Sequence, residues 1–322
     1  MNSDIECKMS ECPLTSIIVP NYNNANYLSA CFNSILNQTH INVEIVVIDD
    51  ASTDNSWDVI KHYQNFHPDK ISALFLRKNG GVAHARHIGI IQSKGEYITT
   101  LDADDYYSDR RKLEKEIELV MQYKRKHNKD IIAFSNIVLE RADGTKTIQG
   151  NENNIVQGNI TSQIISRNCM IPRDFTFLKS IYFEVGGYDL KRPIYEDWDL
   201  KIRIAAKHEF YYTGINGTAY RRHGNGLSSV QAPTHIKHLK EIFKNNSKLI
   251  SKIERPEVDR AFNNFISKMK MNYINKMSGE IQKNIKNRQF KEIFKNYCTI
   301  FMNDKLYLNP NKFIKILRNN LK

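Results

Sequence analysis

The sequence predicts an α/β protein in which an open, mostly parallel sheet with flanking helices precedes a basic helical region. Three observations support this prediction: short apolar runs rich in β-branched residues, helical stripes between these runs, and positive charge concentrated in the last third of the chain. Strands buried on both faces read as continuous apolar runs, and their alternation with helices is typical of parallel sheets. We therefore expect a sheet domain followed by a helical region.

The alternation occupies the first hundred residues. Apolar runs predict strands at 16–20, 43–48, 71–76 and 97–101, and the stripes between them predict helices at 26–38, 52–60 and 82–92. Short connections of this kind build one open sheet, and ligands of such sheets bind beyond the carboxyl ends of the strands. Residues 20–23, 49–50 and 102–105 each follow a strand end, so we expect them to meet at one rim.

The next hundred residues are less regular. The pattern predicts a helix at 110–127, a strand at 131–139 and a hairpin turn at Asp143-Gly144. Residues 151–173 show no regular pattern, and we expect them to form a wall of the ligand site at the rim. A turn at 186–189 precedes a helix that opens with Glu196 and Asp197. From His235 onward we expect amphipathic helices broken near Pro256 and Pro310. The predicted divisions are a flexible N-terminus at 1–13, a sheet domain at 14–230 and a helical region at 231–322.

Composition narrows the class of protein. The chain has 322 residues, of which 41% are hydrophobic, and no window approaches eighteen uninterrupted apolar residues. Its first thirteen residues are polar and partly acidic, unlike a signal peptide, so we expect a cytoplasmic protein. The five cysteines are scattered and form no C-x-x-C pair, which argues against a disulfide framework and against a zinc site.

The net charge of +12 is unevenly distributed. Residues 231–322 contain 20 Lys and Arg against 7 Asp and Glu, a net charge of +13, so residues 1–230 carry −1. A neutral part suited to chemistry and a basic part suited to an anionic partner indicate two roles. A biased base composition is the simpler explanation of the Lys-rich tail. No nucleic-acid-binding module is recognisable, so we do not expect a nucleic-acid partner.

An acidic cluster follows the strand at 97–101. Asp102, Asp104 and Asp105 place three carboxylates within four positions. Mg²⁺ and Mn²⁺ prefer oxygen ligands and are often held by one or two carboxylates together with the phosphates of a substrate. The alternative is that acidic residues here merely cap the following helix, a role that suits Asp109. A D-x-D triplet alone does not decide between the two.

An ordered set of motifs resembles family 2 glycosyltransferases of the GT-A fold. It consists of Ile17 to Asn23, Val46 to Asp54, Asn79-Gly80-Gly81 with Ala85, Arg86 and Gly89, Asp102 to Asp105, and Gly186 to Asp189 followed by Glu196-Asp197. Each motif alone is weak, and their order makes the set specific. A nucleotidyltransferase would need a glycine-rich loop after the first strand, and none is present.

The resemblance implies a nucleotide-binding role for the first half of the chain. It implies that Asp104 binds Mn²⁺ or Mg²⁺ directly, that Asp102 reaches the ribose or the metal through water, and that Asp105 lies behind them. It also places Asp50 on the uracil edge and Arg86 near the nucleotide. Pro20 and Tyr22 would lie beside the base, although ordinary core packing is an alternative role for Tyr22. For Asp49, helix capping is the alternative role. His87 stands where the family usually has Asn.

The second half would contribute the catalytic groups. We expect Asp197 to be the general base of a single inverting displacement. The like charge of Glu196 would raise the pKa of Asp197, and the helix dipole would lower it. The segment Tyr220 to His223 resembles a late Tyr-Arg-x-His element. It implies that Arg221 holds the leaving phosphate and that His223 completes the metal shell, and it leaves open whether Arg221 or Arg222 points inward.

Donor and acceptor follow from the resemblance in outline only. A UDP-sugar is the expected donor, and a glycan or lipid-linked glycan in bacterial surface polysaccharide biosynthesis is the expected acceptor. Residues 311–322 gather apolar side chains on one helical side and basic ones around the other. This pattern suits peripheral binding to an anionic membrane, packing onto the sheet domain, or a homo-oligomer contact. A catalytically inactive scaffold protein on the same fold is the alternative function.

Overall fold

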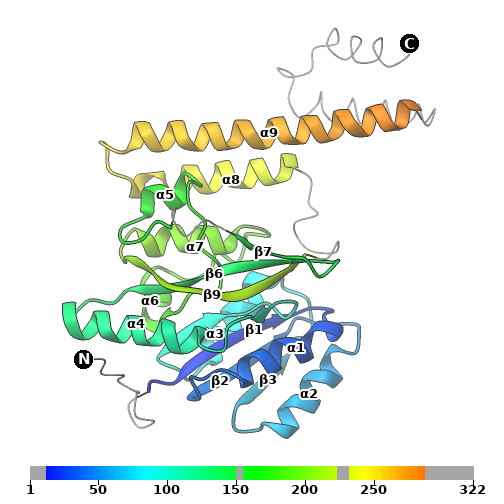
Figure 1. Cartoon of the computed structure of the whole chain (residues 1–322), viewed down its shortest axis with the longest axis vertical. Coiled ribbons are helices and arrows are strands. Elements are labelled where there is room, and N and C mark those ends of the chain that lie inside the picture. The colour runs from blue at the N-terminus through cyan, green and yellow to red at the C-terminus, as the bar shows by residue number, and fades with distance from the viewer. Residues whose placement is uncertain (1–11, 150–154, 223–231, 287–322) are drawn as a thin grey trace.

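The structure, a computed structural model, describes residues 12–149, 155–222 and 232–286. Two sheets lie one above the other, with helices packed around them and two long helices on top (Figure 1). This architecture confirms the predicted α/β class with a mostly parallel sheet.

The first sheet has the strand order β3-β2-β1-β4-β8. Its members are β1 (Thr15–Asn21), β2 (Val43–Asp49), β3 (Ile71–Phe75), β4 (Tyr97–Thr100) and β8 (Phe177–Leu178). The first four are parallel, as predicted, and the short β8 pairs antiparallel with β4. Asn21 lies beside Asp49 in this register, so the polar residues that follow β1 and β2 share one edge of the sheet.

The strands β1 and β2 are buried on both faces, and alternate residues serve opposite layers. Ile18, Val46 and Ile48 pack with helix α3 (Val82–Gln92), whereas Ile17 and Val19 pack with α1 (Ala25–Leu36) and α2 (Ser56–Phe66). The continuous apolar runs therefore reflect helices on both faces. A Cβ on Gly89 would lie 2.4 Å from Ile18 Cγ2, so a glycine at this position lets α3 approach β1 closely.

The second sheet has the order β5-β9-β6-β7. It comprises β5 (Tyr106–Tyr107), β6 (Ile132–Arg141), β7 (Lys146–Gln149) and β9 (Phe210–Arg222), with α4 (Lys112–His127) packed against β6 and β9. The predicted hairpin at Asp143-Gly144 joins β6 to β7, and Gly144 has a φ of 82°. The long strand β9 was not predicted, because its mixture of aromatic, polar and glycine residues lacks an apolar run.

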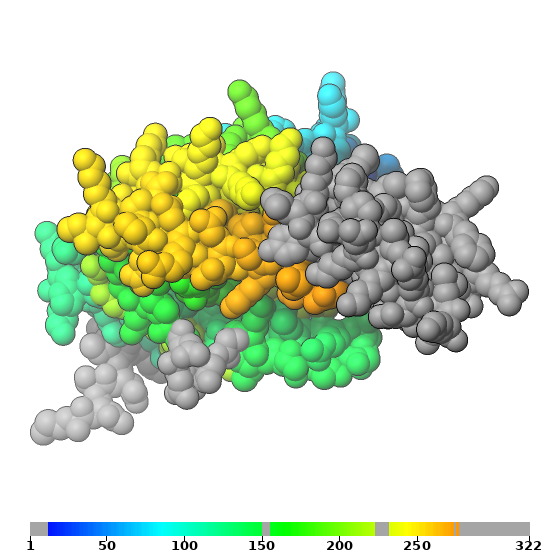
Figure 2. Space-filling view, turned by 90° about the horizontal axis from the view of Figure 1, so that it is seen from above, coloured from blue at the N-terminus to red at the C-terminus, as the bar shows by residue number. Residues whose placement is uncertain are grey.

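The remaining helices connect the sheets to the C-terminal region. They are α5 (Thr161–Ile165), α6 (Lys179–Glu184), α7 (Glu196–Ala205), α8 (Ala232–Asn246), the 3-10 helix η3 (Ser247–Leu249) and α9 (Arg255–Lys286). Figure 2 shows α8 and α9 covering the upper face. Even the 32-residue α9 lacks a stretch apolar enough to cross a membrane, as do the other helices in the described ranges.

The helices α8 and α9 share a core with α7. Leu239 and Phe262 belong to the same buried cluster as Trp198. Phe262 stacks between Phe243 and Trp198, at ring-centroid distances of 4.0 and 6.4 Å. Buried Asn246 donates a hydrogen bond of 2.8 Å to Asp199 of α7. The chain up to about residue 269 therefore packs as one body, and residues 311–322 lie outside the described ranges.

Candidate active site

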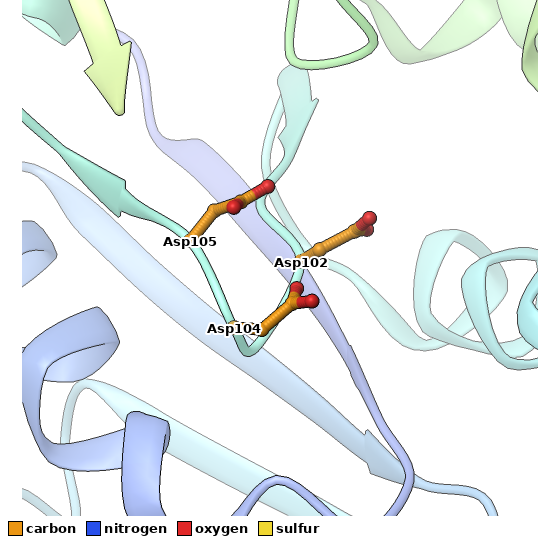
Figure 3. A group of neighbouring side chains, drawn as sticks. All are labelled: Asp102, Asp104 and Asp105. Atoms are coloured by element: carbon orange, nitrogen blue, oxygen red, sulfur yellow. The ribbon is translucent and has the colours of Figure 1, made fainter. Parts of the chain in front are cut away.

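The acidic cluster lies in the turn between β4 and β5. Asp102, Asp104 and Asp105 project from this one short loop (Figure 3), and their nearest carboxylate oxygens all lie within 4.8 Å of one another. The backbone N–H of Asp105 closes the turn by donating to the carbonyl of Asp102 at 2.9 Å. Three hard oxygen donors at this spacing fit a divalent cation such as Mg²⁺ or Mn²⁺.

Three arginines surround these carboxylates. Arg86 of α3 is buried and binds Asp102 at 2.6 Å, and Arg173 forms ion pairs with both Asp102 and Asp105. Arg221 of β9 donates its backbone N–H to Asp105 at 2.9 Å and a guanidinium N–H to the carbonyl of Asp104 at 3.0 Å. The cluster is therefore close to electrically balanced by groups of the protein itself.

Burial and the arginines shift these acids in opposite directions. For Asp102, burial favours the neutral form, but Arg173 and Arg86 outweigh it and hold the pKa below its usual value. For Asp105, burial raises the pKa to about 7, with Asp104 and Asp102 adding to the rise and Arg173 opposing it. A bound divalent cation would favour the ionised form of each acid.

The first turn of α7 brings Glu196 and Asp197 to the cluster. Arg86 binds Glu196 at 2.5 Å with one Nη and Asp102 at 2.6 Å with the other, so it connects α7 to the acidic turn. Lys201, one helical turn after Asp197, lies 2.7 Å from its carboxylate. Burial opposes the charge of Asp197, but Lys201, Arg86 and Arg173 outweigh this effect and lower its pKa. Asp197 is therefore ionised at neutral pH, as a proton acceptor must be.

Three of the expected nucleotide-binding residues, Pro20, Tyr22 and Asp50, lie at or just after the ends of β1 and β2. Asp50 is buried and accepts hydrogen bonds from the backbone N–H groups of Gly80 at 2.8 Å and Gly81 at 2.7 Å, so it also holds the turn before α3. Tyr22 is 47% exposed, which rules out core packing as its role. Buried Pro20 is the penultimate residue of β1 and pairs with Ile48, at the same edge of the sheet. Their contacts with a base remain predictions.

The end of β9 shows which of Arg221 and Arg222 points inward. Arg221 stacks over Tyr106 at 4.5 Å and contacts the acidic turn, whereas Arg222 is exposed. Arg221 is therefore the inward residue. His223, the expected metal ligand, lies outside the described residues, so its role stays a prediction.

Two residues of the site were missed by sequence reasoning. Lys201 follows Asp197 by four positions in a helix, and this spacing is a recognised signal for an ion pair. Arg173 contacts carboxylates about seventy residues earlier in the chain, and the sequence around Arg173 contains no pattern that predicts this contact.

The departure at His87 has a structural role. His87 Nδ1 lies 2.7 Å from the hydroxyl of Tyr182, and this hydroxyl accepts a hydrogen bond of 3.0 Å from the backbone N–H of Tyr188. His87 thus supports the turn Gly186-Gly187, whose residues have φ angles of 83° and 65°. The same turn leads toward Glu196 and Asp197 at the start of α7.

The fold and the site together define a GT-A glycosyltransferase architecture, and the comparisons agree. The model of glycosyl transferase family 2 matches residues 16–187, more than half of the chain. The chain therefore belongs to glycosyl transferase family 2, and the resemblance in its motifs is confirmed. The match ends before α7, so Asp197 lies outside the matched residues.

Curated relatives and solved structures are consistent with this family. The chain is 33% identical over 133 residues to the putative teichuronic acid biosynthesis glycosyltransferase TuaG of Bacillus subtilis, covering 41% of this chain and 50% of that protein. It is 36% identical over 136 residues to the glycosyltransferase GlyG of Streptococcus pneumoniae, covering 42% of each. These matches span half or less of the length of each relative.

Among solved structures, S. aureus TarS in complex with UDP-GlcNAc superposes with a TM-score of 0.59. The sequences are 16% identical, and the match covers 89% of this chain and 90% of that one. At this identity the likeness shows a shared fold.

Proposed function

We propose that this chain transfers a sugar from a nucleoside diphosphate sugar, with a UDP-sugar the expected donor, to a hydroxyl of a glycan or lipid-linked glycan. The proposed pathway is bacterial surface polysaccharide biosynthesis. Family membership supports the reaction type, the UDP-GlcNAc complex of TarS supports the donor class, and the name of TuaG supports the pathway.

The geometry that carries this proposal is the bridge made by Arg86. It binds Asp102 of the acidic turn and Glu196 of α7, the residue directly before Asp197, and this supports a proposal in which the acidic turn and Asp197 act on one substrate. Sugar transfer requires charge stabilisation on the departing diphosphate and removal of a proton from the attacking hydroxyl. The acidic turn serves the first requirement and Asp197 the second.

Each residue has a defined part in the proposed reaction. Asp104, together with Asp102, would hold Mn²⁺ or Mg²⁺, which supplies Lewis-acid stabilisation of the leaving diphosphate when bound. The guanidinium of Arg221 binds the leaving phosphate as a hydrogen-bonding cation. Asp197 accepts the proton of the acceptor hydroxyl. Because one base and no carboxylate nucleophile take part, the displacement inverts the anomeric carbon.

A donor screen tests this function directly. Purified protein is heated with Mn²⁺ and each of several nucleotide sugars, and the donor that binds raises the unfolding temperature by mass action. Release of UDP in the presence of a glycan acceptor then measures transfer, and NMR of the product anomer reports inversion. Failure of every UDP-sugar to bind would contradict the proposed donor class.

The inactive-scaffold alternative makes the opposite prediction about catalysis. A scaffold would bind the nucleotide sugar without consuming it, whereas an active transferase hydrolyses its donor slowly when Mn²⁺ is present and no acceptor is supplied. The presence of Asp104 and Asp197 in the site favours the active enzyme. Donor hydrolysis with wild-type protein, absent in Asp104→Ala, distinguishes the two.

We also propose a cytoplasmic location, with peripheral binding to the inner face of the cell membrane or self-association through the C-terminal helices. The net charge of +13 in residues 231–322 supports attraction to anionic lipid, at about 1 kcal/mol for each basic residue near the surface. Co-sedimentation of the full chain with phosphatidylglycerol vesicles tests this, using Lys312→Ser combined with Lys315→Ser as the comparison. Protein that stays in the supernatant at low salt would contradict membrane binding, and light scattering would report an oligomer.

A further inference from the structure

Arg173 forms ion pairs with two of the three carboxylates in the acidic turn. Its Nε lies 2.9 Å from Oδ2 of Asp102, and its Nη2 contacts Oδ2 of Asp105. Arg86 binds the other oxygen of Asp102 at 2.6 Å, and the backbone N–H of Arg221 donates to the other oxygen of Asp105 at 2.9 Å. All four oxygens of Asp102 and Asp105 therefore contact donors of this chain.

The backbone of Arg173 is firmly anchored. Its N–H donates to the hydroxyl of Tyr220 at 3.0 Å, and its carbonyl accepts from Thr100 Oγ1 at 3.1 Å. The next residue, Asp174, is buried, and its carbonyl accepts a hydrogen bond of 2.8 Å from Lys112, which is itself fully buried. The Cα of Arg173 is thus held in place by three secondary-structure elements.

The guanidinium of Arg173 has more freedom than its backbone. Its side chain is 30% exposed and stacks over the ring of Tyr220 at 4.3 Å. Arg86, by contrast, is 2% exposed and is also bound to Glu196. Of these two cations on Asp102, Arg173 is the one that can exchange its carboxylate partners for another anion.

A divalent cation and the guanidinium of Arg173 compete for the same oxygens. Two positive charges a few ångströms apart repel, and Asp102 and Asp105 are less available as ligands while they bind Arg173. A diphosphate removes this conflict, because it offers the guanidinium a bidentate acceptor and offers the cation further oxygens. Metal and diphosphate should each bind weakly alone and strongly together.

We propose that Arg173 is an internal counter-ion of the acidic turn that couples binding of the divalent cation to binding of the donor diphosphate. The inference rests on the proposed function, since it assumes that the turn receives a metal and a nucleoside diphosphate. In the ligand-free protein Arg173 neutralises Asp102 and Asp105. When the metal and the diphosphate enter together, Arg173 turns from the carboxylates to the phosphates.

The test is Mn²⁺ affinity with and without UDP, measured from the EPR signal of free Mn²⁺. We compare wild type, Arg173→Gln, and the matched control Arg255→Gln, which removes an arginine paired with Asp259 at 2.7 Å on α9. We expect Arg173→Gln to bind Mn²⁺ alone about tenfold more tightly than wild type, because a repelling cation is lost. We expect UDP to strengthen Mn²⁺ binding much less in this variant, while the control behaves as wild type.

Coupling is reciprocal, so the same factor must appear in UDP affinity measured with and without Mn²⁺. Arg173→Lys provides a second variant, in which a point charge reaches one carboxylate at a time and gives an intermediate Mn²⁺ affinity. Wild-type coupling that persists unchanged in Arg173→Gln would overturn the inference and leave the proposed function intact. Absence of Mn²⁺ binding from wild type and variant, with or without UDP, would overturn both.

Discussion

The substitution Asp197→Asn separates catalysis from binding. The variant keeps the shape of the side chain but loses the ability to accept a proton. A positioned general base contributes about two to four orders of magnitude in rate, so we expect turnover to fall by that amount while UDP-sugar affinity changes little. This loss corresponds to about 3 to 5 kcal/mol in the activation barrier.

The structure also predicts how much stability this substitution costs. Lys201 lies 2.7 Å from Asp197, and its ammonium group also donates to the carbonyl of Ile171 at 2.9 Å. Breaking a fully buried ion pair costs about 3 to 5 kcal/mol. Because Lys201 keeps the Ile171 carbonyl and Asp197 is 27% exposed, we expect about 1 to 2 kcal/mol here. A loss of this size leaves most of the protein folded at assay temperature.

The assay measures UDP release with donor and acceptor, together with donor affinity by calorimetry. Asp199→Asn is the matched control, because Asp199 lies on the same helix and pairs with Arg203 at 2.8 Å and with Asn246. The control should lose stability and keep turnover within about tenfold of wild type. Turnover of Asp197→Asn within about fivefold of wild type would refute the assignment of Asp197 as the base.

Three further substitutions test the metal site, a buried histidine and the C-terminal helices. Asp104→Ala should abolish both transfer and Mn²⁺-dependent UDP binding in calorimetry, and unchanged affinity would remove Asp104 from the metal site. His40 is buried beside Thr15, with Nε2 3.1 Å from Oγ1, and burial lowers its pKa. The unfolded chain therefore binds a proton that the folded chain resists, so stability should fall as the pH drops below about 6.5. Urea unfolding at several pH values checks this, and an equal pH slope in His40→Asn would contradict it. Phe262→Ala should cost about 3 to 5 kcal/mol in the same experiment, because it removes the ring between Phe243 and Trp198. A loss below about 1 kcal/mol would show that α9 adds little to the core.

The four parallel strands of the first sheet were predictable from local pattern. Ile17 to Val19 and Ile45 to Ile48 are apolar without interruption, because helices cover both faces of the sheet, and the structure confirms the two strands within a residue or two. The acidic turn was predictable for a similar reason. Its three carboxylates are neighbours in sequence, so their proximity needs no long-range contact.

The sequence by itself therefore determined the α/β class, the family and the acidic turn, because each of these depends on short local patterns or on the order of motifs along the chain. The tertiary structure alone decided which cations balance that turn. Arg86 of α3, Arg173 of the loop before β8 and Arg221 of β9 come from three separate parts of the chain, and only folding brings them to Asp102 and Asp105. It also decided that α8 and α9 pack on α7, because an amphipathic helix exposes the same apolar stripe to any surface that covers it.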